Sequence, residues 1–269
     1  MSTCSARVVD ESAASFYASA LTKLEAAAIP CLIGGAFAFA KLTGIERYTK
    51  DLDLFVKPAD CRRVLDLFDA IGYRTEMPFP HWLGKVRCGP YFMDVIFSSG
   101  NGVARVDDLW FTHATAARLF DRPVRLCPAE EMIWSKSFVQ ERERFDGADV
   151  MHIIRELGSS LDWDRLLTRF DDHWRILLAH VVTFGYVYPD QRQQIPEWVV
   201  AELMRRLAAE PADAKSRVCR GTLLSREQYL VDIERFGYRD ARLEPDGPMT
   251  PEEIEVWTAA IGTPDDDAK

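Results

Sequence analysis

Apolar and polar residues follow a helical period in two stretches near the start of the chain, and a short apolar strand separates them. Residues 11–28 are rich in Ala and Leu with polar interruptions, which predicts an amphipathic helix. The apolar residues 31–33 predict a short strand that ends at Gly34-Gly35. The next stretch, 36–42, predicts a helix that begins directly after the two glycines.

The following residues carry the signals of a sheet. Residues 51–56 alternate between polar and apolar side chains with a period of two, which is typical of a strand. A helix is predicted over 59–71, and three more strands are predicted at 73–76, 85–87 and 91–97, before a loop at 98–102. This order of elements predicts an α+β fold, a small mixed β-sheet with flanking helices.

The pattern changes after residue 127. Helical spacing of apolar residues recurs in five stretches, at 129–145, 149–157, 162–170, 175–185 and 198–209. An acidic tail follows, with a helix predicted over 251–261 and a frayed end at 262–269. We therefore expect two domains, a sheet domain at 1–127 and an all-helical domain at 128–269.

Composition and charge narrow the class of protein. The chain has no apolar run long enough to cross a membrane and no signal-peptide pattern at its start, so we expect a cytoplasmic protein without a membrane partner. The formal net charge of −9 argues against a protein that coats nucleic acid non-specifically, because phosphate binding needs a basic surface. The six cysteines form no C-x-x-C pair and are expected to be free thiols.

Candidate chemistry begins with Asp51 and Asp53, which are two residues apart on a predicted strand and therefore leave the same face. Two carboxylates on one face repel each other unless cations lie between them, and Mg²⁺ suits such oxygen ligands. In most D-x-D pairs, however, one Asp is a solvated strand residue and the other caps a turn.

Two neighbouring features strengthen the metal interpretation. Gly34 and Gly35 lie between a strand and a helix, where backbone N–H groups can approach an anion at the helix N-terminus. Asp94 stands inside an otherwise apolar strand, where a charge needs a partner. That partner is either a metal ion or a salt-bridging side chain.

The glycine turn, the D-x-D strand and the later Asp94 together resemble the polymerase-β-like nucleotidyltransferase superfamily. The resemblance is closest from Ile33 to Leu54, which looks like the same stretch in antibiotic nucleotidyltransferases and in abortive-infection (type IV) toxin nucleotidyltransferases. One departure is that Ala36 follows the glycines where many members have Gly-Ser, so phosphate binding would rest on backbone N–H groups.

A second stretch in the helical half resembles the toxin-like members. Lys136 is followed by Arg144, Asp146 and Asp149 in the R-x-D-x-x-D order of that family. The resemblance implies that Lys136 and Arg144 bind phosphates and that Asp146 and Asp149, expected on one helical face, are accessory acids. A solvated, salt-bridged face is an equally good interpretation of these charges.

The resemblance implies in-line transfer of a nucleotidyl group from a nucleoside triphosphate, such as ATP, to an acceptor hydroxyl with release of pyrophosphate. Asp51, Asp53 and Asp94 would be both catalytic residues and ligands of two Mg²⁺ or Mn²⁺ ions. The nucleotide would also be bound by Gly34, Gly35, Arg47, Thr49, Lys136 and Arg144.

The acceptor stays open at this point. The toxin-like branch implies a tRNA or a protein, and a cognate antitoxin as a possible partner. The alternatives are an antibiotic nucleotidyltransferase acting on an aminoglycoside- or lincosamide-like small molecule, and a non-catalytic nucleotide-binding or antitoxin-like protein on the same fold. An intact acidic trio argues against the non-catalytic alternative.

Overall fold

A computed structural model describes residues 10–211 and 216–261 of the chain. The chain forms two compact units, one of residues 1–100 and 105–128 and the other of residues 101–104 and 129–269. Within the described ranges, no helix is both long and apolar enough to cross a membrane. The five described cysteines are free, as expected from their spacing.

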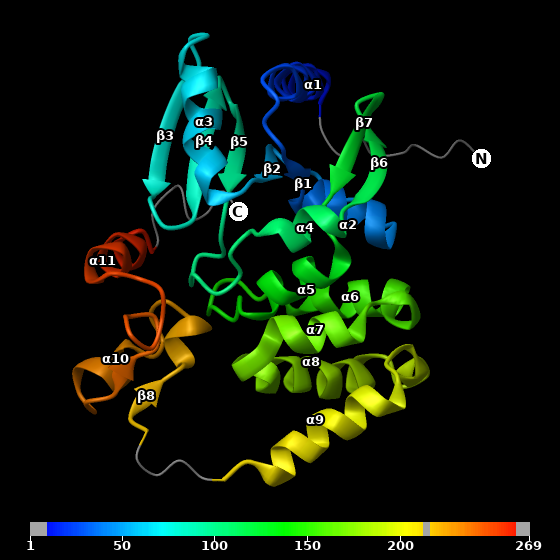
Figure 1. Ribbon diagram of the computed structural model, residues 1–269, viewed down its shortest axis with the longest axis vertical. Helices are drawn as coiled ribbons and strands as arrows, with labels where there is room; N and C mark the ends of the chain where they lie inside the picture. The colour runs from blue at the N-terminus through cyan, green and yellow to red at the C-terminus, as the bar shows by residue number, and fades with distance from the viewer. Residues whose placement is uncertain (1–9, 212–215, 262–269) are drawn as a thin grey trace. The chain divides into compact units, whose positions relative to one another are not determined.

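The first unit is a mixed sheet with helices, coloured from blue to green in Figure 1. Its seven strands lie in the order β3-β4-β5-β2-β1-β7-β6. The strands are β1 (Leu32–Ile33), β2 (Asp51–Phe55), β3 (Arg74–Phe79), β4 (Leu83–Cys88), β5 (Tyr91–Ile96), β6 (Thr115–Leu119) and β7 (Arg122–Leu126). The helices are α1 (Glu11–Ala26), α2 (Gly35–Thr43), α3 (Pro58–Asp69) and α4 (Asp108–Thr112). The predicted mixed sheet with flanking helices is confirmed.

Strand pairing sets which residues become neighbours across the sheet. β2 runs parallel to β5, with Asp53 opposite Asp94, and β4 runs antiparallel to β5, with Lys85 opposite Asp94. The two-residue strand β1 is antiparallel to β2 and parallel to β7. Residues opposite each other in adjacent strands present their side chains on the same face, so Lys85, Asp94 and Asp53 lie in one row.

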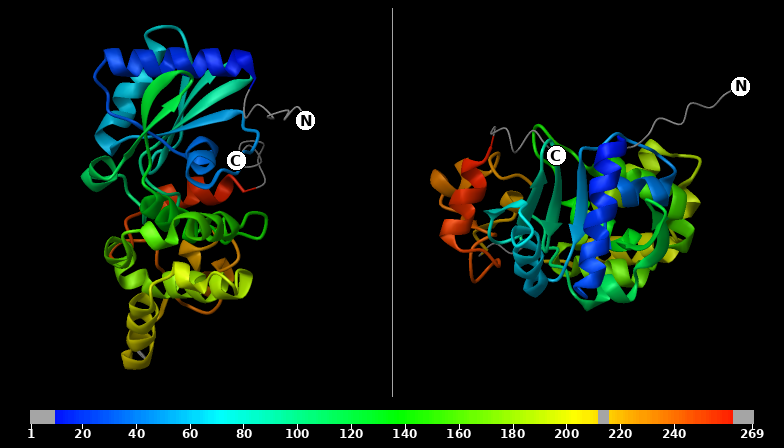
Figure 2. Two further views of the ribbon diagram at one scale, coloured as in Figure 1. Left: turned by 90° about the vertical axis from the view of Figure 1, so that its right-hand side faces the viewer. Right: turned by 90° about the horizontal axis from the view of Figure 1, so that it is seen from above.

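The opposite face of these strands is apolar and packed. Leu52, Leu54 and Val95 are fully buried there, and α3 runs along β3, β4 and β5 (Figures 1 and 2). At Gly84 the backbone comes so close to α3 that an added Cβ would lie 3.2 Å from the side chains of Cys61 and Leu65. Because α3 occupies the apolar face, the polar row is left on the other.

The second unit consists mainly of helices. The longer helices are α5 (Ala129–Ser137), α6 (Gly147–Leu157), α7 (Trp163–Phe170), α8 (Trp174–Val187), α9 (Glu197–Ala209) and α11 (Pro251–Ala259). Short elements complete it: 3-10 turns, the helix α10 (Leu230–Glu234), and the parallel two-residue strands β8 (Val218–Cys219) and β9 (Arg239–Asp240). In Figure 2 (left), α9 runs at a steep angle to α8. The expectation of an all-helical second half is therefore wrong at β8 and β9.

Other predicted elements also differ from the structure. The helix predicted over 129–145 ends at Ser137, because the chain turns back on itself: Gln140 pairs with Phe145, and the N–H of Glu141 donates to the carbonyl of Arg144 at 2.8 Å. β6, β7 and α4 were not predicted. The frayed end expected at 262–269 lies outside the described residues.

Candidate functional site

The candidate site is a group of three carboxylates on the polar face of the sheet. Asp51 and Asp53 alternate along β2 with the fully buried Leu52 and Leu54, which anchor the strand to the core. Asp94 lies on β5 directly opposite Asp53. One carboxylate oxygen from each aspartate lies within 4.8 Å of the others, so the structure brings the three predicted acidic residues together.

The glycine turn is packed directly against Asp53. The N–H of Gly34 donates to the backbone carbonyl of Asp53 at 2.9 Å. Gly35 has a φ of +51°, and a Cβ there would lie 2.5 Å from Asp53 Cγ. A Cβ on Gly34 would overlap the ring of Phe55. Both glycines are therefore required by close approach, and no side chain fits between the turn and Asp53.

The same turn opens helix α2. Gly34 is the N-cap residue and provides no side-chain hydrogen bond to the helix. The first N–H groups of a helix have no partner within the helix, and its dipole makes that end positive. An N-terminus that begins beside Asp53 can therefore receive the oxygens of an anion.

Asp51 is fixed from two sides. The hydroxyl of Thr49 donates to Asp51 Oδ1. The fully buried Tyr17 donates its hydroxyl to the carbonyl of Lys50 at 2.7 Å, one residue before Asp51. Burial first, and then the charge of Asp51, raises the pKa of Tyr17 well above its ordinary range, which favours the protonated hydroxyl that donates this bond. Tyr17 was not predicted to be near the site.

Asp94 has a partner that the sequence interpretation did not identify. Lys85 and Asp94 have side chains only 1% exposed, and Lys85 Nζ lies 3.2 Å from Asp94 Oδ1. The same ammonium lies 4.5 Å from the centroid of the Phe92 ring. Lys85 falls within the predicted strand 85–87, but nothing in its local sequence indicates burial.

The chemistry of the donors fits a divalent metal ion. Three carboxylates are gathered within 4.8 Å, and Lys85 pairs with one of them, Asp94. Hard cations such as Mg²⁺ and Mn²⁺ take carboxylate oxygens as ligands. We therefore identify Asp51, Asp53 and Asp94 as the residues able to hold such ions.

Arg47 and Thr49 precede the acidic strand. Arg47 is exposed, and its guanidinium lies 4.5 Å from the centroid of the Phe39 ring. Thr49 is engaged with Asp51. Phe39 belongs to α2, the helix that begins at the glycine turn. Contact of Arg47 and Thr49 with a nucleotide stays a prediction.

The charged residues singled out in the helical half form a compact cluster in the second unit. Lys136 Nζ lies 2.8 Å from Asp146 Oδ2 and 3.0 Å from Asp149 Oδ2, and Arg144 donates two hydrogen bonds to Asp146 at 3.0 and 2.8 Å. Asp146 is the N-cap residue of α6 rather than a residue on its face. Burial alone would raise the pKa of Asp146, but Lys136 and Arg144 outweigh it and hold that pKa well below its ordinary value. A phosphate would have to compete with these carboxylates for Lys136.

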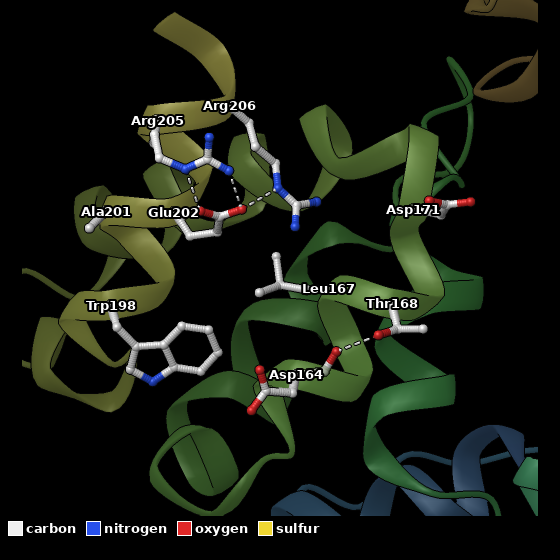
Figure 3. A pocket seen from close by; sticks show the side chains of 9 residues that line it. All are labelled: Asp164, Leu167, Thr168, Asp171, Trp198, Ala201, Glu202, Arg205 and Arg206. Carbon is white, nitrogen blue, oxygen red and sulfur yellow. Dashed lines mark hydrogen bonds and ion pairs between the residues drawn. The ribbon is translucent and has the colours of Figure 1, made fainter. Parts of the chain in front are cut away.

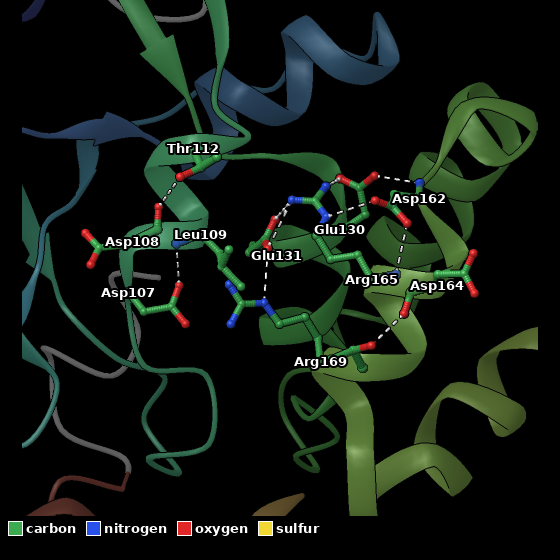
Figure 4. A network of polar contacts seen from close by, with 11 residues as sticks. Asp107, Asp108, Leu109, Thr112, Glu130, Glu131, Asp162, Asp164, Arg165 and Arg169 are labelled. Carbon is green, nitrogen blue, oxygen red and sulfur yellow. Dashed lines mark hydrogen bonds and ion pairs between the residues drawn. The ribbon is translucent and has the colours of Figure 1, made fainter.

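A second network of ion pairs joins α5 to α7 (Figure 4). Glu131 is fully buried and lies 3.2 Å from both Arg165 Nη1 and Arg169 Nε, while Glu130 also pairs with Arg165. Burial raises the pKa of Glu131, and the two arginines oppose that shift. Each charge has a partner of opposite sign, which is typical of a structural network.

The second unit also has an open groove of about 880 Å³ between α7 and α9 (Figure 3). Glu202 accepts hydrogen bonds from Arg205 at 2.8 and 2.9 Å and from Arg206 at 2.8 Å. Both arginines of the groove are therefore paired with Glu202. The groove contains none of the residues predicted to carry chemistry.

Comparison with known proteins gave matches only among solved structures. No family model and no curated protein matches the chain. The antibiotic-resistance factor ANT(2'')-Ia matches at 18% identity and a TM-score of 0.41, over 74% of this chain and 95% of that one. The lincosamide antibiotic adenylyltransferase LnuA, with lincomycin bound, matches at 17% identity and a TM-score of 0.39, over 54% of this chain and 96% of that one.

An antigenic nucleotidyltransferase-like protein from Paracoccidioides brasiliensis matches at 18% identity and a TM-score of 0.45, over 69% of this chain and 93% of that one. Of these neighbours, LnuA is named as an adenylyltransferase and the Paracoccidioides protein as nucleotidyltransferase-like. Because the TM-scores lie below 0.5, the function proposed next rests on the residues of the chain itself.

Proposed function

We propose that the chain is a metal-dependent nucleotidyltransferase. The observation that carries this proposal is the convergence of Asp51, Asp53 and Asp94 within 4.8 Å, beside a glycine turn that leaves no room for a side chain. A carboxylate trio next to a helix N-terminus combines ligands for divalent ions with N–H groups for phosphate oxygens. That combination suits a nucleoside triphosphate bound as its metal complex.

In the proposed reaction, an acceptor oxygen forms a bond to the α-phosphorus of the triphosphate. The bond from that phosphorus to the bridging oxygen breaks, and pyrophosphate leaves with its electron pair. Two Mg²⁺ or Mn²⁺ ions, when bound, would stabilise negative charge on the phosphate and acceptor oxygens.

The chain's own residues take distinct roles in this proposal. Asp51, Asp53 and Asp94 would hold the ions, and Asp94 would also receive the acceptor's proton. The N–H groups of Gly35 and of the first turn of α2 bind the β- and γ-phosphates, because the N–H of Gly34 already donates to the carbonyl of Asp53. Supporting these roles, the glycine turn is hydrogen-bonded to Asp53.

For the acceptor, we propose a tRNA or a protein side chain. This choice rests on the toxin-like succession of Lys136, Arg144, Asp146 and Asp149 along the sequence. An antitoxin partner would follow from that assignment. The net charge of −9 favours a cationic small molecule as the second candidate, because such an acceptor is attracted to an acidic protein.

The test is transfer from each α-labelled nucleoside triphosphate in the presence of Mg²⁺ or Mn²⁺ and a cell extract. Label in RNA or protein supports the first acceptor class, and label in the small-molecule fraction supports the second. Pyrophosphate release should be lost in Asp53→Asn and retained in Asp69→Asn, a control that removes an exposed carboxylate from α3.

Full activity of Asp53→Asn would contradict the proposal. Calorimetry separates the non-catalytic alternative, because a binding protein would take up Mg²⁺-nucleotide without releasing pyrophosphate.

A further inference from the structure

A fully buried lysine stands within the acidic row of the sheet. Lys85 projects from β4 opposite Asp94 and is 1% exposed, with its ammonium 3.2 Å from Asp94 Oδ1. The face of the Phe92 ring lies 4.5 Å from the ammonium and covers it. Lysine is almost never fully buried unless it is paired, so this position is determined by the charges around it.

Lys85 lies at one end of the acidic row, next to Asp94. Asp94 faces Lys85 on one side and Asp53 on the other, because β5 lies between β4 and β2. Asp51 completes the trio within 4.8 Å. Like charges at such distances destabilise the fold unless a cation offsets them. The ammonium of Lys85 is a cation that the chain itself supplies.

The contact is an ion pair between buried atoms. Asp94 Oδ1 is fully buried and lies 3.2 Å from the ammonium of Lys85. Asp53 faces Asp94 from β2.

We propose that Lys85 is a positioning residue that serves as the resident cation of the acidic trio. It keeps Asp51, Asp53 and Asp94 assembled before any divalent ion binds, and its positive charge lowers the affinity of the trio for a free ion. Divalent ions are therefore recruited mainly together with nucleotide phosphates. This inference rests on the proposed metal site, and it concerns the free protein rather than nucleotide transfer.

The test uses the full chain without nucleotide and titrates it with Mn²⁺ alone. Calorimetry gives the affinity, and thermal unfolding in EDTA and in Mn²⁺ gives the stabilisation by the ion. Lys85→Met should bind Mn²⁺ at least about tenfold more tightly than the unaltered chain, because a neighbouring like charge is removed. Its Tm should fall in EDTA and should rise more on addition of Mn²⁺, since the ion replaces the missing charge.

Two further variants separate charge from packing. Lys85→Arg retains the positive charge and should bring the Mn²⁺ affinity back toward that of the unaltered chain. Lys50→Met removes an exposed lysine next to Asp51 and should change the affinity by less than about threefold, since exposed charges are screened by solvent and salt.

Equal affinity and equal stabilisation by Mn²⁺ in the unaltered chain and Lys85→Met would overturn the inference. So would a Lys85→Met protein that stays unfolded with Mn²⁺ as well as without it, because the ion would then not replace the ammonium. A Lys85→Met protein that folds only with Mn²⁺ supports the inference. Pyrophosphate release by the unaltered chain is measured separately and decides the proposed function. If Lys85→Met binds Mn²⁺ more tightly but the unaltered chain releases no pyrophosphate, the role of Lys85 is supported and the proposed enzyme activity is rejected. If pyrophosphate is released but Mn²⁺ affinity is unchanged in Lys85→Met, only the role of Lys85 is rejected.

Discussion

Replacing Gly35 by alanine tests whether the glycine turn and the acidic strand form one site. Gly35 has a φ of +51°, and its added Cβ would lie 2.5 Å from Asp53 Cγ and 3.0 Å from Asp53 Cβ, where ordinary contacts are 3.4–4 Å. Gly44, at the C-terminal end of the same helix, provides a matched control. It also has a positive φ, +71°, but an added Cβ there meets nothing within 4 Å.

The two substitutions share one cost and differ in another. Left-handed backbone at a residue with a Cβ costs about 1–2 kcal/mol, and this cost applies to both. Only Gly35→Ala must also move the Asp53 side chain or the backbone of the turn, and overpacking of this kind costs about 1–3 kcal/mol more. We therefore expect a loss of about 1–2 kcal/mol for Gly44→Ala and about 2–5 kcal/mol for Gly35→Ala.

Thermal unfolding measures the loss of stability, at about 2–4 °C in Tm for each kcal/mol in a chain of this size. Mn²⁺ titration measures the metal affinity of the site. Gly35→Ala should bind Mn²⁺ more weakly because Asp53 is displaced, while Gly44→Ala should bind it as tightly as the unaltered chain does. If both variants lose the same stability and bind Mn²⁺ equally well, Gly35 is not packed against Asp53 in solution, and the reasoning fails.

Three further substitutions address the surroundings of the site and the second unit. Tyr17→Phe should lower the free energy of unfolding by about 1–3 kcal/mol, because the carbonyl of Lys50 loses its buried donor; an unchanged Tm would show that water replaces the hydroxyl. Glu131→Ala should cost about 3–5 kcal/mol, because Arg169 loses its buried carboxylate and Arg165 keeps only that of Glu130 in the network, and a loss below 1 kcal/mol in urea unfolding would argue against the network. In Lys136→Met, the free energy of unfolding should depend less steeply on pH in the acid range. The pKa of Asp146 is held below its ordinary 3.8, so its ion pairs stabilise the fold above about pH 4 and this contribution is lost as the pH falls; an unchanged slope below pH 4 would contradict that.

Much of the site could be predicted from local sequence. The alternation in 51–56 places Asp51 and Asp53 on one face, and a single Asp in an apolar strand indicates a partnered charge. Their convergence depends on β2 pairing in parallel with β5, which local pattern does not specify. Only the family resemblance indicated that Asp94 joins the other two.

Other features depend on contacts distant in the sequence. A lysine in a strand usually reaches solvent, and Lys85 is buried because the β4–β5 register sets it opposite Asp94. The β6–β7 hairpin escaped prediction because Phe120 and Asp121 form its turn at positive φ without the usual Asn-Gly or Asp-Gly signal. The helix from 129 was extended too far, since the charges of 141–144 fit an exposed helical face as well as the turn they form.

The two-residue strand β1 has a consequence for how the protein is made. Strands β1 to β5 all lie before residue 97, and the same part of the chain holds the acidic trio, its lysine and the glycine turn. Only β7, which pairs with Ile33, and its neighbour β6 are synthesised later. Chains fold as they emerge from the ribosome, N-terminal parts first. The acidic site can thus assemble while the helical unit is still being translated, and β7 joins the sheet through a single short strand afterwards.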